Sequence, residues 1–241
     1  MRFSVDIFFD SNSSVKIPLT YRRDIVSLIK EALKIENPNF FELYYGDKSK
    51  NKQKPFTFSI YLPNSVKENN EKLIVLQDNK LGLHFSSNDY PFFISVYNGL
   101  LKVKNFKLFG TEIKIKHFHL KKEVKFEEKM VFKTFTPILL RDIQHKKGKG
   151  YLSHDNNKFI EQGKYTIRNL SKYFLDLDIS IDDINFTPIK IKSDIVSLYG
   201  GEVGNSGIFM LEAPKEVLKL VYDIGFGAKR SQGFGMIDIV G

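Results

Sequence analysis

The chain has 241 residues, with 37 lysines and arginines against 28 acidic residues, so its formal net charge is +9. A basic balance of this size favours polyanionic partners, nucleic acid above all. The absence of cysteine excludes disulfides and thiolate metal sites and fits a cytoplasmic protein, and no apolar run approaches the roughly 18 residues that cross a membrane.

The first half of the sequence predicts the element order β-α-β-β-α-β with one additional hairpin. Alternating apolar residues predict a strand over 3–9, and apolar residues at helical spacing predict a helix after Pro18. The remaining expected elements are strands over 40–45, 55–62 and 103–120, a hairpin of 73–77 with 82–86, and a helix over 89–101.

The second half predicts the same order. Its expected elements are a strand over 130–139, a basic loop over 141–150, a helix over 157–175, strands over 189–199 and 207–211, a helix over 214–224 and a final strand near 236–240. We therefore expect an α+β protein made of tandem ferredoxin-like (RRM-like) βαββαβ domains, residues 1–124 and 125–241, with a C-terminal glycine-rich loop.

The glycine-rich segment GFGAKRSQGFG runs from Gly225 to Gly235. Glycine lets a backbone approach a ligand closely, and the two cations Lys229 and Arg230 make phosphate its natural ligand. The loop follows a helix and precedes a strand, which is the reverse of a dinucleotide-binding fingerprint, and no P-loop motif is present. A glycine-rich turn with solvated cations is the alternative interpretation.

These features together resemble one known family. The ending YDIGFGAKRSQGFGMIDI (Tyr222–Ile239), with KPFTFS (Lys54–Ser59), FKTFTPILL (Phe132–Leu140) and YGGEVGNSGIFML (Tyr199–Leu211), is similar to the CRISPR-associated endoribonucleases of the sixth Cas family, in the RAMP superfamily. The resemblance implies processing of pre-crRNA into guide RNAs without a metal or other cofactor. Attack by the 2′-hydroxyl would leave 2′,3′-cyclic phosphate and 5′-hydroxyl ends.

That chemistry needs a base, an acid and a cation near the reacting phosphate. Many members of the family carry a histidine after the first helix, but here that position falls on Tyr44 or Tyr45. Tyrosine is a poor base near neutral pH and a serviceable proton donor. The expected catalytic residues are Tyr21, Tyr44, Tyr45 and Lys52, and the alternative for each is ordinary packing or a solvated loop.

Expected RNA contacts lie in the two basic loops and in the segment before the expected strand over 55–62. These residues are Lys54, Arg141, His145, Lys146, Lys147, Gly225, Gly227, Lys229, Arg230, Ser231 and Gly233. His117 and His119 are expected on the same face as Ile113 and Ile115, as ordinary strand residues, and His154 as a turn residue.

Three hypotheses remain open. The first is a repeat-specific endoribonuclease with a histidine-poor site, and the second is a repeat-RNA-binding protein of the same family that cuts slowly or not at all. The third is a structural subunit of a CRISPR effector complex, and the two-half layout with its GFGM ending argues against it. The expected partners are CRISPR repeat RNA, an effector complex and a second copy of the chain, and no membrane.

Overall fold

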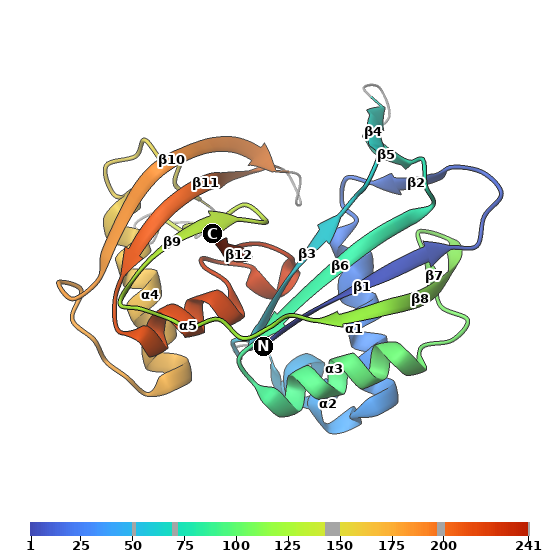
Figure 1. Cartoon of the computed structure of the whole chain (residues 1–241), viewed down its shortest axis with the longest axis horizontal. Helices are drawn as coiled ribbons and strands as arrows, with labels where there is room; N and C mark the ends of the chain where they lie inside the picture. The colour runs from blue at the N-terminus through green and yellow to red at the C-terminus, as the bar shows by residue number, and fades with distance from the viewer. Residues whose placement is uncertain (50–51, 69–71, 143–149, 197–200, 241) are drawn as a thin grey trace. The chain divides into compact units, whose positions relative to one another are not determined.

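The computed structural model describes residues 1–49, 52–68, 72–142, 150–196 and 201–240. The chain divides into two compact units, Met1–Lys122 and Glu123–Gly241. Each unit combines helices with antiparallel sheet (Figure 1), which confirms the predicted α+β class. Within the described residues, every helix is too short or too polar to cross a membrane.

The first unit contains a large antiparallel sheet and a small one. Its strands are β1 (Arg2–Phe9), β2 (Val15–Pro18), β3 (Phe56–Tyr61), β4 (Ser65–Glu68), β5 (Leu73–Leu76), β6 (Lys80–Ser87), β7 (Lys107–Leu108) and β8 (Thr111–Leu120). Its helices are α1 (Arg22–Glu36), α2 (Pro38–Tyr45), the short 3-10 helix η1 (Asp47–Ser49) and α3 (Tyr90–Lys102). The strand orders are β3-β6-β1-β8-β7 in the large sheet and β2-β5-β4 in the small one.

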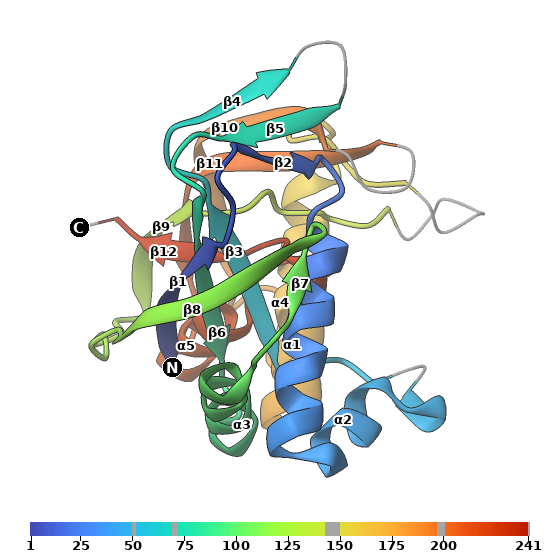
Figure 2. The same cartoon turned by 90° about the vertical axis from the view of Figure 1, so that its right-hand side faces the viewer.

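The core of the first unit lies between the large sheet and helices α1 and α3. Alternate residues of β1 are buried, because a strand turns successive side chains to opposite faces. Phenylalanines fill the space: the ring centroids of Phe3 and Phe85 lie 5.2 Å apart, and those of Phe56 and Phe92 lie 5.3 Å apart. Figure 2 shows α2 beside the C-terminal end of α1.

The predicted strand over 40–45 is wrong, because this segment is helix α2. The Asn37 side chain accepts a hydrogen bond from the Phe40 N–H at 3.2 Å, and Pro38 occupies the first turn. An asparagine cap followed by proline starts a helix even where aromatic residues favour a strand. The helix stacks Phe41 on Tyr45 four residues later, with ring centroids 5.9 Å apart.

The predicted hairpin of 73–77 with 82–86 is also wrong. Strand β5 pairs with β2 and β4, whereas β6 pairs with β1 and β3. Asn79, at φ 45°, turns the chain between the two sheets. Its side chain accepts from the Val15 N–H at 3.0 Å and donates to the Ser11 carbonyl at 3.0 Å, so it also fixes the start of β2.

In its described residues, the second unit has one antiparallel sheet and two α-helices. Its elements are β9 (Lys129–Thr134), α4 (Phe159–Leu175), β10 (Asn185–Val196), β11 (Glu202–Glu212), α5 (Lys215–Ile224), the 3-10 helix η2 (Arg230–Gln232) and β12 (Ile237–Ile239), with strand order β10-β11-β9-β12. Buried phenylalanines again form the core, and Phe226 of the glycine-rich segment packs edge-on against Phe186 at 5.3 Å. The glycine-rich segment therefore begins inside the core.

Candidate active site and nucleic-acid interface

Two lysines of the first unit lie against one tyrosine ring. Lys30 comes from α1, Tyr45 ends α2, and Lys54 lies just before β3. Each ammonium nitrogen is 4.8 Å from the centroid of the Tyr45 ring. The negative face of an aromatic ring attracts cations. We call these three residues the lysine–tyrosine cluster.

The environment changes the proton affinity of this cluster. Burial lowers the pKa of Lys54, and the positive charge of Lys30 lowers it further. Burial raises the pKa of the Tyr45 hydroxyl above its ordinary value, so this group stays protonated. That hydroxyl is buried and makes no hydrogen bond to any residue in the described part of the chain. The cluster therefore provides a cation that gives up its proton more readily than usual, a second cation, and a hydroxyl donor.

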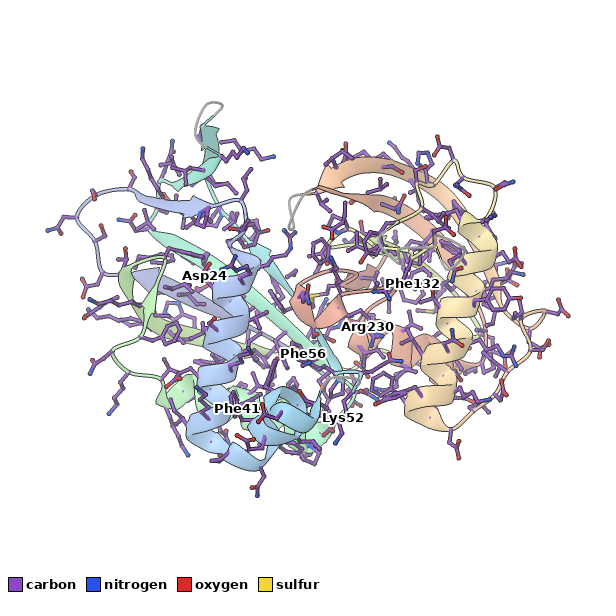
Figure 3. The ribbon with its side chains drawn as sticks, turned by 180° about the vertical axis from the view of Figure 1, so that it is seen from behind. Asp24, Phe41, Lys52, Phe56, Phe132 and Arg230 are labelled. Carbon is purple, nitrogen blue, oxygen red and sulfur yellow. The ribbon has the colours of Figure 1, made fainter. Side chains whose placement is uncertain are left out.

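The other expected catalytic residues lie in different surroundings. Tyr44 packs edge-on against Phe92 with centroids 5.1 Å apart. Tyr21 immediately precedes α1, nine residues before Lys30, which is about 13 Å along a helix axis. Lys52 is exposed to solvent (Figure 3). The structure thus joins the expected Tyr45 and Lys54 to a lysine that the sequence did not single out, and it sets Tyr21 apart from them.

The glycines of the C-terminal loop bring its backbone against the unit's own chain. A Cβ on Gly227 would lie 2.7 Å from the Leu139 carbonyl oxygen, and one on Gly235 would lie 1.9 Å from the Phe226 carbonyl oxygen. Both glycines have positive φ, at 98° and 66°. The Gly235 N–H donates to the Pro137 carbonyl at 2.9 Å. Packing alone accounts for glycine at these two positions.

The remaining residues expected at this loop have contrasting environments. Lys229 forms an ion pair with Glu202. Arg230 is only 7% exposed and lies over the Phe174 ring at 5.6 Å, and burial lowers its pKa to about 10. Ser231 is partly exposed. Gly225 ends α5, and Gly233 follows η2 in the left-handed region. The loop therefore holds its cations by intramolecular contacts.

The second basic loop is described only at its two ends. Exposed Arg141 pairs with Tyr151 in an antiparallel bridge, and the Asp142 N–H donates to the Gly150 carbonyl at 2.9 Å. The expected RNA-binding residues His145, Lys146 and Lys147 lie outside the described residues.

The expected orientation of the strand histidines is wrong. The pairing of β1 with β8 shifts register between Ser4 and Asp6, opposite His117, which has φ 54°. His119 pairs with Ser4, on the face opposite to the buried Ile113. His117 instead reaches Asp6, with Nδ1 at 3.0 Å from Oδ2. Among the described residues, no group of three or more histidine or acidic side chains is placed to hold a metal ion.

Comparison with known proteins agrees with this architecture. The family model for the C-terminal part of the CRISPR-associated protein Cas6 matches residues 120–239. The CRISPR-associated endoribonuclease Cas6 1 of Methanocaldococcus jannaschii is 26% identical, over 97% of this chain and 91% of its own length. A putative CRISPR-associated endoribonuclease-like protein Cas6 of Pyrococcus furiosus is 23% identical, over 93% and 92%.

The fold is shared as well. The solved structure of an RAMP protein binding different RNA substrates has a TM-score of 0.83 to this chain, at 19% identity and over the whole of both chains. The family model covers the second unit, and the relatives and the fold extend over both units. This chain belongs to the Cas6 family of CRISPR-associated proteins.

Proposed function

We propose that this chain binds CRISPR repeat RNA and cuts pre-crRNA into guide RNAs, and that the lysine–tyrosine cluster is its catalytic centre. The observation that carries the proposal is the placement of Lys30 and Lys54 against Tyr45, in a member of the Cas6 family. The elements β1-α1-β3-β6-α3-β8 of the first unit and β9-α4-β10-β11-α5-β12 of the second follow the β-α-β-β-α-β order, which supports the tandem ferredoxin-like description. In that arrangement the N-terminal domain, expected from the sequence over residues 1–124, is the catalytic domain.

The proposed reaction is a phosphoryl transfer within the RNA. The 2′-oxygen attacks the adjacent phosphorus as its proton passes to solvent water, the bond from phosphorus to the 5′-oxygen breaks, and that oxygen gains a proton from the enzyme. The products are a 2′,3′-cyclic phosphate and a 5′-hydroxyl. Lys54 is the proposed proton donor, because its lowered pKa makes it a stronger acid than an ordinary lysine.

The other two members of the cluster would stabilise the negative charge that develops during the reaction. Negative charge grows on the phosphoryl oxygens during the reaction, and fixed donors and cations near them lower the barrier. Lys30 is the proposed cation, and the Tyr45 hydroxyl is the proposed hydrogen-bond donor, because its raised pKa keeps it protonated; since this hydroxyl is buried in the free protein, RNA binding must expose it. Neither role needs a histidine.

The residues proposed to bind the RNA backbone lie in the second unit. Lys229, Arg230 and Ser231 of the glycine-rich segment would contact backbone phosphates, together with Arg141 and the basic loop that follows it, and Arg230 would have to leave its buried position over Phe174 to do so. Lys229 would have to exchange its ion pair with Glu202 for a phosphate. The pair is partly buried, with 20% and 15% of the two side chains exposed, so breaking it costs more than the roughly 1 kcal/mol or less of an exposed pair, and the polyanion must supply that difference.

A repeat RNA with one deoxyribose tests the reaction. The protein is incubated in EDTA with a cognate repeat RNA and with a copy that lacks the 2′-hydroxyl at the cut. We expect cleavage of the first RNA only, with a cyclic phosphate on the upstream product. Cleavage of the deoxy copy would exclude 2′-hydroxyl attack.

The second candidate function is repeat-RNA binding without efficient cleavage. It is favoured by one observation: tyrosine stands where many members of the family carry a histidine. Tight binding of both RNAs with no cleavage of either would establish this function and refute the catalytic proposal. Failure to bind any repeat RNA would refute both.

A further inference from the structure

His154 is held by a series of hydrogen bonds that starts in the core of the second unit. The amide nitrogen of buried Asn205 donates to the Ile138 carbonyl at 3.2 Å and to the Leu152 carbonyl at 2.9 Å. Because two carbonyls take the two amide hydrogens, the amide oxygen Oδ1 must be the atom that faces Ser193, whose Oγ lies 2.8 Å away. The hydroxyl hydrogen of Ser193 therefore points to Asn205.

Ser193 then has only lone pairs left for His154. Its Oγ lies 2.9 Å from the backbone nitrogen of His154 and 2.7 Å from Nδ1 of the imidazole. Since Oγ accepts at both, Nδ1 carries the hydrogen. A neutral imidazole with hydrogen on Nδ1 has an acceptor at Nε2, and the partner of one nitrogen thus fixes the role of the other.

The outer edge of this imidazole is available to a ligand. His154 is exposed, and Nε2 makes no hydrogen bond to any residue that the structure describes. The flanking charges are Asp155 in the chain and, next to Ser193 on β10, Lys192 and Asp194, which form an ion pair at 3.2 Å. The ligand that suits an oriented acceptor at Nε2 is a hydrogen-bond donor, not a phosphate oxygen.

We propose that His154 contacts RNA and accepts a hydrogen bond at Nε2 from a ribose 2′-hydroxyl or a base amino group. The proposal rests on the proposed RNA-binding function. His154 lies shortly after the basic segment that begins at Arg141, and Tyr151 ties the two ends of that segment together. Cations there attract the backbone without regard to sequence, whereas an oriented acceptor distinguishes one nucleotide group from another.

Atom-by-atom changes in the RNA test the contact. Dissociation constants are measured at pH 8. One RNA series carries a single 2′-deoxy substitution at each position, and another carries purines without the exocyclic amino group. Wild-type protein, His154→Ala and the control His119→Ala, which alters an exposed histidine of the first unit, are compared.

We expect one nucleotide at which loss of a donor weakens wild-type binding by roughly 2- to 10-fold, the worth of one hydrogen bond. The same loss should leave His154→Ala binding unchanged and should weaken His119→Ala as it weakens wild type. The deoxy and amino-free series show which donor is used. Identical penalties in wild type and His154→Ala at every position would overturn this inference alone, whereas a wild type that binds no repeat RNA refutes the proposed function and this inference with it.

A variant of Ser193 tests whether the contact needs the orientation of the His154 ring as well as its presence. Ser193→Ala keeps His154 and removes the group that fixes its tautomer, so it should reduce the penalty at the same nucleotide, and Ser193→Thr should restore it. Thermal unfolding of each variant confirms that the second unit is folded. A full penalty in Ser193→Ala would show that the Asn205–Ser193 pair does not prepare His154 for the contact.

Discussion

Replacing Gly235 with alanine should lower the free energy of unfolding of the second unit, and the size of this loss follows from the structure. An alanine at φ 66° costs about 1–2 kcal/mol. Its Cβ would lie 1.9 Å from the Phe226 carbonyl oxygen, so the backbone must move. That movement breaks two hydrogen bonds, Phe226 N–H to the Gly235 carbonyl at 2.8 Å and Gly235 N–H to the Pro137 carbonyl at 2.9 Å. Each contributes about 1 kcal/mol, which brings the expected loss to roughly 3–4 kcal/mol.

Gly110 provides a matched control for the backbone conformation. It has φ 81°, and a Cβ there would meet no atom within 4 Å, so Gly110→Ala should cost only the conformational part, about 1–2 kcal/mol. Urea unfolding followed by circular dichroism measures both free energies, since the chain has no tryptophan. Equal losses in the two variants would refute the argument that the loop glycines are needed for packing.

Three further predictions concern the first unit, the first of them with a matched control variant. Lys30→Met removes a positive charge near Lys54, so the pKa of Lys54 should rise. The high-pH limb of the plot of cleavage rate against pH should then move to higher pH. The control Lys34→Met, on the same helix and over the neighbouring Phe41 ring, should leave this plot unchanged. Tyr45→Phe should leave the melting temperature unchanged or raise it, because it removes a buried hydroxyl without a partner among the described residues, while it slows cleavage. Asn37→Ala should lower the free energy of unfolding by about 1 kcal/mol, measured in urea, because it removes the α2 cap.

The sequence predicted elements well where local signals agreed. The helix expected over 214–224 is α5, because Pro214 stands at its start, Gly225 ends it, and its apolar residues recur at helical spacing. The segment 40–45 failed because its aromatic residues favour strands in isolation, while the capping signal lies outside it, at Asn37. The helix cap at Asn37 therefore outweighed the strand propensity of the aromatic residues in this segment.

The candidate site was predictable only in part. Tyr45 and Lys54 could be singled out from the motif, but Lys30 reaches Tyr45 only because α2 packs against α1. The role of Ser193 in holding His154 depends on the β10–β11 register, which places Ser193 opposite Asn205. No spacing rule in the sequence specifies such contacts, since they arise from tertiary packing.

The most direct test of the account is the single-turnover cleavage rate of Lys54→Met, measured with its affinity for repeat RNA and beside Lys34→Met. Loss of a catalytic proton donor typically slows a reaction by about 10²–10⁴-fold. We predict a loss in this range for Lys54→Met, with affinity within a few-fold of wild type, and little change for Lys34→Met. Equal rates for the two variants would contradict a catalytic role for the lysine–tyrosine cluster.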